Sequence, residues 1–344
     1  MNTPRRAPVI ADVARAAGVS VPTVSRVLTG STPVSDEKRE RVLRAIEMLG
    51  YRPNAAARAL VRGSQPLVAV FAGNTTRYGY ARTIQGIEEA ARAAGRIVVI
   101  TVIESEDEAE VRAAVDLVLG QTISGAIVLD YDPQGATTLQ AIGDSVPTVV
   151  ATPSAGYSTF PSITMDDETA GREATEYLLG LGHRTVHHIA IPHSGGPGGR
   201  AVGWRTALEA AGAEVPDIIG ADWEPMSGYR AGQQLAAIGD ATAVLCGNDE
   251  LAMGVARALA EAGLRIPRDV SIIGFDDQPL AELWQPALTT VRQDFVELGR
   301  QAYALLDGVI ARTTSHRIER AKPELIVRES TAAPAPERLA AARS

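Results

Sequence analysis

The chain has 344 residues, enough for two or three compact domains, and its 45% hydrophobic and 22% charged residues are typical of a globular protein with a large core. One cysteine, Cys246, excludes an internal disulfide and a cysteine-based zinc site. No apolar run is long enough to span a membrane, and no signal-peptide core follows Met1, so we expect a cytoplasmic protein.

The net charge of −8 is unevenly divided along the chain. Residues 1–63 carry 11 basic and 5 acidic side chains, whereas the remainder carries 22 basic and 36 acidic ones. A basic head on an acidic body is the pattern of a nucleic-acid-binding module joined to another domain. Charge alone does not distinguish such a module from a solvated basic helix.

Three helices are predicted in the basic head. Residues 10–17 place apolar side chains three and four positions apart, and Gly18 suits the left-handed residue that ends a helix. Ser20 can cap a second helix that reaches Gly30, and a third begins near Ser35. Two short helices joined by a tight glycine turn, closed by a third, predict a helix-turn-helix whose second helix enters the major groove of DNA.

The second helix supplies the candidate base readers. Arg26 is the best of them, because its guanidinium can bond both acceptors of a guanine. Thr23 and Ser25 suit phosphate or base-edge contacts. A generic three-helix packing unit with an exposed arginine is the alternative. The candidate DNA-contacting residues of this segment are Ser20, Val21, Pro22, Thr23, Ser25 and Arg26.

A short helix is predicted after Tyr51, capped by Asn54, rich in alanine and stopped by Gly63. It is too short to be stable alone. Leu60, an apolar side chain on a basic stretch, can wedge between base pairs in the minor groove. The pattern equally allows a linker helix with Leu60 packed on the body.

Residues 10–28, 34–42 and 49–60 closely resemble, in order, the head and hinge of the lactose-repressor (LacI/GalR) family. The resemblance implies that Val21, Pro22 and Arg26 read the major groove. It also implies a hinge helix that binds DNA through Asn54, Ala57, Arg58 and Leu60, with Leu60 intercalating. Pro22 departs from the polar reader that members often carry, so readout there must be apolar.

From Leu67 onward, apolar runs alternate with helical stretches. This order predicts parallel sheets covered by helices on both faces, and a break near Ser162–Asp166 divides the pattern into two lobes with a cleft between them. The predicted strands are 67–71, 97–103, 125–129, 148–151, 186–191, 243–246 and 270–275. The predicted helices are 80–94, 106–119, 169–181, 203–211, 228–237, 249–262 and 295–309.

Polar side chains follow several of these strands, at the edge where parallel sheets bind ligands. They are Asn74, Asp130, Asn248, Asp249, Asp276 and Asp277. With Arg200, such groups can bond vicinal hydroxyls, and Trp223 can stack on a sugar face. Helix capping and ordinary core packing are the alternatives for each of them.

Residues 222–229, 248–254, 274–277 and 288–295 resemble the sensor domains of the same family, especially its lactose-repressor branch. The resemblance implies a periplasmic-binding-protein-like sensor domain and a sugar effector, with a β-galactoside or another β-linked disaccharide favoured. A nucleoside or purine effector stays open. The candidate effector-binding residues are Arg77, Tyr80, Asp130, Asp166, Arg200, Trp223, Asn248, Asp276 and Phe295.

Other classes of protein are less well supported. His187 and His188 are adjacent in a predicted strand and so point to opposite faces, which argues against a shared metal ion. No nucleophile elbow or phosphate-loop ending occurs, so we expect neither an enzyme nor a cofactor. A periplasmic sugar receptor shares the two-lobed architecture, but the basic head and the missing signal peptide argue against it.

The predicted domains are a helix-turn-helix (1–51), a hinge (52–64) and a sensor (65–332), followed by a disordered tail (333–344). Lobe 1 spans about 65–164 and 294–323, and lobe 2 about 165–291 and 324–332. The proline-containing tail lacks the leucine heptads of a tetramerising helix. We therefore expect a homodimer on a palindromic operator.

Overall fold

The computed structural model describes residues 8–29, 32–51, 67–152, 159–193, 198–313, 318–321 and 323–336. The chain divides into two compact units, Met1–Pro66 and Leu67–Ser344. Each unit has its own hydrophobic core. No helix in the described ranges combines the length and the apolar character that a membrane span requires.

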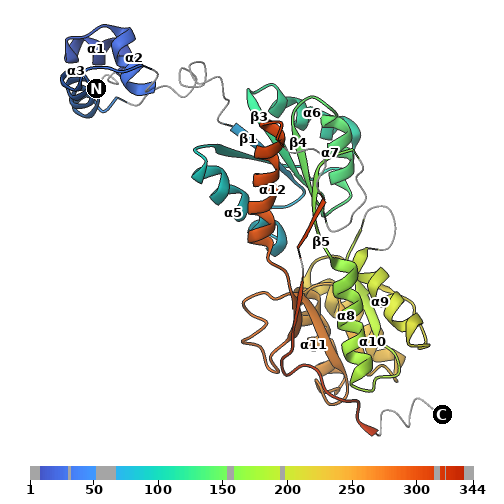
Figure 1. The fold of residues 1–344 in the computed structure, drawn as a ribbon. Coiled ribbons are helices and arrows are strands. Elements are labelled where there is room, and N and C mark those ends of the chain that lie inside the picture. Colours follow the sequence, from blue (N-terminus) through green and yellow to red (C-terminus); the bar gives the residue numbers. More distant parts are fainter. Residues whose placement is uncertain are drawn as a thin grey trace, which may run out of the picture. The chain divides into compact units, whose positions relative to one another are not determined.

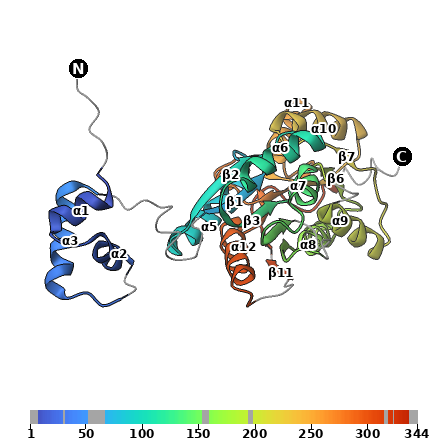
Figure 2. The ribbon, with the colours of Figure 1, turned by 90° about the horizontal axis from the view of Figure 1, so that it is seen from above.

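Within its described residues, the first unit is a bundle of three helices, α1 (Ile10–Ala17), α2 (Val21–Thr29) and α3 (Asp36–Leu49) (Figure 2). Gly18 ends α1 with φ 62°, a left-handed conformation that glycine adopts without a Cβ penalty. The turn lets α2 pack back on α1, and Val13, Val24 and Val42 are buried together in the centre. The predicted helix-turn-helix is confirmed.

The second unit contains, within its described residues, two six-stranded sheets (Figure 1). The first has the order β11-β5-β4-β3-β1-β2 and the second β12-β10-β9-β8-β6-β7. All pairings are parallel except β10 with β12. The strands of the first sheet are β1 (Leu67–Ala72), β2 (Ile97–Val102), β3 (Ile123–Leu129), β4 (Thr148–Thr152), β5 (Ser162–Met165) and β11 (Ile318–Ala321). Those of the second are β6 (His187–Ala190), β7 (Ile219–Gly220), β8 (Ala243–Cys246), β9 (Ser271–Asp276), β10 (Thr289–Arg292) and β12 (Glu324–Ile326).

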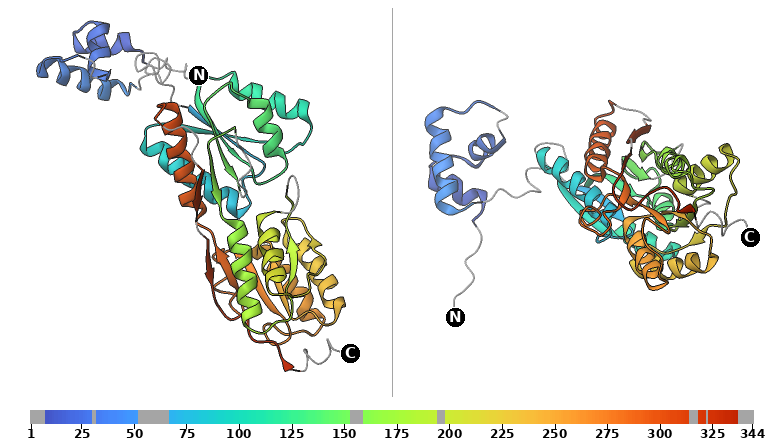
Figure 3. Two further views of the ribbon diagram at one scale, coloured as in Figure 1. Left: turned by 45° about the vertical axis from the view of Figure 1, so that its right-hand side comes forward. Right: turned by 90° about the horizontal axis from the view of Figure 1, so that it is seen from below.

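Helices cover both faces of each sheet, as the alternating sequence pattern predicts (Figure 3). In the first lobe α5 (Tyr78–Ala93) and α12 (Phe295–Ile310) pack on one face. α6 (Glu108–Leu119) and α7 (Gln134–Ile142) pack on the other. In the second lobe α10 (Pro225–Ile238) and α11 (Asp249–Glu261) lie opposite α8 (Asp167–Gly180) and α9 (Gly199–Ala210).

The chain passes between the lobes in three places: between β5 and α8, between β10 and α12, and between β11 and β12. Each lobe is therefore built from distant parts of the sequence. A cavity lies between the two lobes. The second lobe lines it with the carboxyl ends of β8 and β9 and the start of α9, and the first lobe lines it with the start of α5. The predicted α/β architecture with two sheets is confirmed.

Candidate functional site

The cavity between the lobes contains about 910 Å³ of space, part of which is open to solvent. Its lining is rich in aromatic side chains, although the whole chain has few of them. Charged, amide and imidazole groups complete it. The aromatic residues are Tyr78, Tyr80, Tyr131, Trp223 and Phe295, and the polar ones include Arg77, Asp167, His188, His193, Arg200, Asn248, Glu250, Asp276, Gln278 and Gln293.

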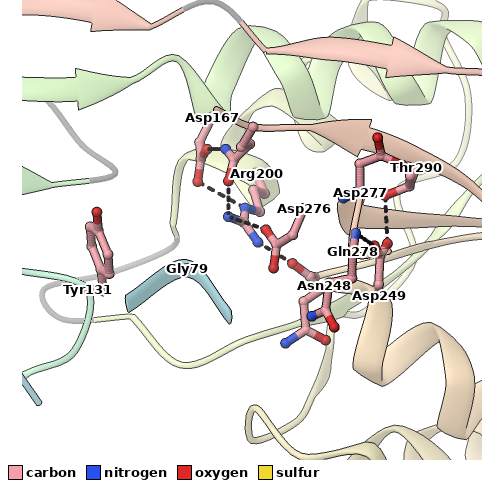
Figure 4. A network of polar contacts seen from close by, with 12 residues as sticks. Gly79, Tyr131, Asp167, Arg200, Asn248, Asp249, Asp276, Asp277, Gln278 and Thr290 are labelled. Carbon is pink, nitrogen blue, oxygen red and sulfur yellow. Dashed lines mark hydrogen bonds and ion pairs between the residues drawn. The ribbon is translucent and has the colours of Figure 1, made fainter. Parts of the chain in front are cut away.

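One side of the lining is polar, and we call it the polar wall; it contains Asp167, Arg200, Asn248 and Asp276, with Arg200 at its centre (Figure 4). Arg200 lies at the start of α9, and its Nε donates to Oδ2 of Asp167 over 2.9 Å. Its two terminal nitrogens donate to the carbonyl of Gly247 and, over 3.2 Å, to Gln293. The guanidinium also lies 4.0 Å from the ring centroid of Phe275. This buried network holds the arginine in one orientation.

Asp276 ends β9 beside this arginine, with a separation of 3.7 Å between its Oδ1 and Nη2 of Arg200. That oxygen is buried and accepts no hydrogen bond from any described residue. Burial raises the pKa of the Asp276 carboxyl well above its ordinary value, and Arg200 offsets part of the effect. The site therefore holds a buried acceptor that lacks a hydrogen-bond donor.

Asn248 follows β8 and combines two roles. Its Oδ1 accepts from the backbone of Leu251 over 2.7 Å, so it caps α11, the alternative that the sequence left open. Its Nδ2 donates to the carbonyl of Trp223 over 3.3 Å. Capping thus fixes an amide group in the lining and ties it to the segment that carries the tryptophan.

Arg77 and Trp223 link the two lobes. The guanidinium of Arg77, at the start of α5, lies 5.1 Å from the ring centroid of Trp223, a cation–π contact. Nη1 of Arg77 bonds both carboxylate oxygens of Asp132, at 3.0 and 3.2 Å. The Tyr80 hydroxyl donates to the same carboxylate over 2.8 Å, and burial raises the pKa of that hydroxyl.

The rest of the first-lobe lining is aromatic. The Tyr131 hydroxyl lies 3.0 Å from Oγ1 of Thr83, and burial raises its pKa. Phe295, the first residue of α12, packs edge-on against Tyr78 with 6.0 Å between ring centroids. These side chains line the first-lobe side of the cavity with aromatic rings.

Seven of the nine predicted effector-binding residues line this cavity, and Asp130 and Asp166 do not. Asp130 accepts from Oγ1 of Thr152 over 3.2 Å. Asp166 caps α8 through the backbone of Thr169 over 3.3 Å. The carboxylate in the lining belongs instead to the next residue, Asp167, which the sequence did not single out.

His188 contributes a neutral group to the lining. Nδ1 of His188 lies 2.9 Å from the carbonyl of Leu245, and burial lowers the pKa of this imidazole to about 4, so it is uncharged near pH 7. Among the described residues, no group of three or more His, Cys, Asp or Glu side chains is arranged to hold a metal ion.

In the first unit, the predicted DNA-contacting residues from Ser20 to Arg26 lie just before α2 and along it. Ser20, Val21, Pro22 and Arg26 are exposed, whereas Thr23 and Ser25 are half-buried. The Ser20 hydroxyl lies 2.9 Å from that of Thr23, next to the helix start. The predicted hinge residues Asn54, Ala57, Arg58 and Leu60 lie outside the described residues.

A helix-turn-helix with an exposed second helix, joined to a two-lobed domain with a ligand-sized cavity, is the organisation of a ligand-responsive gene regulator. Comparison with known proteins agrees. Residues 9–54 match the model of the bacterial regulatory proteins of the lacI family, and residues 175–331 match a periplasmic binding protein-like domain.

The chain is 34% identical over 331 residues to the HTH-type transcriptional repressor PurR of Pectobacterium carotovorum subsp. carotovorum, covering 94% of this chain and 96% of that one. A crystal structure of the lac repressor dimer bound to operator and the anti-inducer ONPF superposes with a TM-score of 0.86 at 30% identity, covering 95% of this chain and 100% of that one. A complex of the transcriptional regulator CelR with cellobiose gives 0.71 at 30% identity, covering 94% and 99%.

The chain belongs to the lacI family of bacterial regulatory proteins. It is a DNA-binding transcriptional repressor of that family and not an enzyme. The family predicted from the head and hinge motifs is confirmed.

Proposed function

We propose that the chain is a dimeric, cytoplasmic repressor that binds a palindromic operator and is controlled by a small sugar held between the two lobes. One observation carries the proposal. Oδ1 of Asp276 is a buried acceptor without a hydrogen-bond donor among the described residues, and it lines the same cavity as Arg200, Asn248 and Trp223.

Sugar hydroxyls suit this polar wall. A hydroxyl can donate to Oδ1 of Asp276 while its oxygen accepts from an arginine or amide nitrogen, and vicinal hydroxyls can do this in pairs. The apolar face of a sugar ring can pack on Trp223 or Phe295. The relative solved with cellobiose, a disaccharide, makes a β-linked disaccharide our first candidate.

A purine is the second candidate. The specific observation in its favour is the similarity to the repressor PurR over 94% of this chain. An aromatic wall stacks a heterocycle as well as a sugar ring, and Asp276 can accept from a ring or amino nitrogen. The two classes differ in shape, because a purine is flat whereas a sugar presents hydroxyls around its edge.

DNA recognition falls to α2 and the residue before it. Arg26, in the last turn of α2, is exposed and can donate hydrogen bonds to both acceptors of a guanine in the major groove. Val21 and Pro22 offer apolar contact, which suits a thymine methyl. Ser20, Thr23 and Ser25 supply hydroxyls for phosphate or base-edge bonds.

The hinge completes DNA binding in this proposal. Asn54 would cap a helix that forms on DNA, with Ala57 and Arg58 against the minor groove. Leu60 would insert between base pairs at the centre of the operator. Two such leucines, one from each subunit, suit a flexible pyrimidine–purine step.

A dimer is supported by apolar side chains at the surface of the second unit. Edge strand β2 exposes Ile97 and Ile100 by 55% and 44%, and Leu280 and Leu283 are 60% and 77% exposed. Apolar surface of this extent favours association with another chain. A symmetric dimer would present two heads to two operator halves.

Control by the effector follows from differential affinity. A sugar that contacts both lobes stabilises the arrangement of lobes that it fits. The coupling free energy between sugar binding and DNA binding is then about 1–3 kcal/mol. We propose that the bound sugar disfavours the paired hinge helices and releases the operator.

A thermal-shift screen of the full chain against cellobiose, other disaccharides, monosaccharides and purines tests the proposal. We expect a sugar to raise the midpoint of unfolding, and Asp276→Ala to abolish that rise. Binding of a purine alone would replace the sugar with the second candidate, and binding of neither class would refute both. Selection of bound DNA from a random pool should return a palindrome.

A further inference from the structure

The end of β9 has an uncommon backbone. Asp276 and Asp277 are consecutive and have φ angles of 101° and 51°. Among the described non-glycine residues, only Arg312 shares a positive φ. L side chains rarely adopt this region, so neighbouring contacts must hold the turn. The turn matters because Asp276 and Gln278, on either side of Asp277, both line the cavity.

Asp249, the first residue of α11, supplies those contacts from inside the protein (Figure 4). Its Oδ2 accepts from the backbone N–H of Gln278 over 2.7 Å. Its Oδ1 accepts from Oγ1 of Thr290, on β10, over 2.6 Å. One carboxylate thus ties the turn after β9 to the neighbouring strand.

Asp249 itself is fully buried and does not line the cavity, although Asn248 and Glu250 on either side of it do. It points behind the polar wall, toward the sheet. Any effect of this residue on a bound ligand must therefore act through the turn that it holds.

Strand β9 has space for this carboxylate. A Cβ at Gly274 would lie only 2.2 Å from Oδ1 of Asp249, so glycine is needed for the close approach. On the outer side of the turn, Asp277 accepts from Arg292 over 2.7 Å and from Arg328 over 2.6 Å. The turn is held from both sides, and Asp249 is the side chain that binds the backbone N–H of Gln278.

We propose that Asp249 is a positioning residue of the effector site, which holds the Asp276–Gln278 turn so that the Asp276 carboxyl faces Arg200. The inference rests on the proposed function, because it concerns the same cavity. Without the Asp249 carboxylate the turn relaxes, and Asp276 and Gln278 no longer meet the effector in a fixed geometry.

Two substitutions separate positioning from general stability. In Asp249→Asn the amide oxygen can still accept from Gln278, and the amide nitrogen can donate to the Thr290 hydroxyl. Asp249→Ala removes both bonds. Asp269→Ala is the matched control: this aspartate also accepts from a backbone N–H and a side chain, both of Arg265, and does not line the cavity.

The first measurement needs no ligand. Amide hydrogen exchange at Gln278 reports directly on the bond to Asp249. We expect exchange at least about tenfold faster than wild type in Asp249→Ala, and wild-type exchange in Asp249→Asn and Asp269→Ala. Exchange in Asp249→Ala that stays as slow as in wild type would overturn the proposal.

The second measurement is calorimetric titration of each full-length variant with cellobiose, ribose and guanine. For whichever probe binds the wild type, Asp249→Ala should weaken binding about tenfold, with Asp249→Asn and Asp269→Ala close to wild type. Equal losses in the alanine and asparagine variants would contradict positioning. If no probe binds the wild type, the proposed effector classes fail, and the exchange measurement still decides the role of Asp249.

Discussion

Removing the Arg200 side chain should destabilise the second unit strongly. The side chain is only 11% exposed and lies 2.9 Å from Asp167 and 3.7 Å from Asp276. Arg200→Ala leaves these two carboxylates buried without their cation. Breaking a buried ion pair in this way costs about 3–5 kcal/mol, so we expect the free energy of unfolding to fall by that amount at pH 8.

The loss of unfolding free energy in Arg200→Ala should depend on pH, and the Asp276 carboxyl determines whether it grows or shrinks as the pH falls. Burial already raises the pKa of its carboxyl, and Arg200 is the group that lowers it, so the variant raises it further. A carboxyl with a raised folded-state pKa disfavours folding above its unfolded-state pKa, and this penalty disappears as the pH falls. The difference in unfolding free energy between wild type and variant should therefore shrink as the pH falls through the raised folded-state pKa of the Asp276 carboxyl.

The assay is urea unfolding followed by circular dichroism at one fixed protein concentration, over a series of pH values. Arg205→Ala is the matched control, because Arg205 lies on the same helix but is exposed, with its guanidinium 5.8 Å from the centroid of the Trp204 ring. That control should change stability by less than about 1 kcal/mol. A loss in Arg200→Ala below about 1 kcal/mol, or one that stays constant across the whole pH series, would refute the reasoning.

Three further predictions concern other parts of the chain. Arg26→Ala should relax the preference for guanine at one operator position at a cost of about 1–3 kcal/mol, measured by anisotropy on single-base operator variants; a uniform loss on every sequence would point to a phosphate contact instead. Burial raises the pKa of Asp249 from 3.8 to about 7. The wild type should therefore lose stability relative to Asp249→Asn as the pH rises from 3.8 to 7, by roughly 4 kcal/mol at most. Urea unfolding at several pH values measures this difference, and a difference independent of pH would contradict the raised pKa. Leu283, 77% exposed, is placed in the proposed dimer surface, so Leu283→Glu should shift the molar mass in light scattering from dimer toward monomer, and an unchanged dimer would exclude Leu283 from the interface.

Local chemistry made much of the fold predictable. Gly18 and Ser35 mark helix ends, because a left-handed glycine favours the end of a helix and serine favours the position just before one. The short apolar run Ala243–Cys246 was predicted as a strand with correct bounds. α7 was missed because Gly135 and two adjacent threonines, which are weak helix formers, interrupt its short sequence. β7 and β12 have only two and three residues, too few for a periodic pattern.

From the sequence, only those cavity residues could be predicted that follow a strand or belong to a family motif. Arg200, Asn248 and Asp276 lie at such positions and line the cavity. Asp132, which holds Arg77 and Tyr80, was missed because its role depends on a contact 52 and 55 residues away in sequence. Asp166 and Asp167 are adjacent carboxylates, and only the three-dimensional start of α8 decides which one caps and which one meets Arg200.

The central claim is that a ligand in this cavity controls binding of DNA by the head. The most direct test is anisotropy of a labelled operator, selected as above, titrated with the full chain at rising concentrations of the sugar that stabilises it. We predict that saturating sugar weakens operator binding about 5- to 150-fold in the wild type and leaves Asp276→Ala unaffected. Operator affinity that does not change at sugar concentrations known to saturate the cavity would contradict the account.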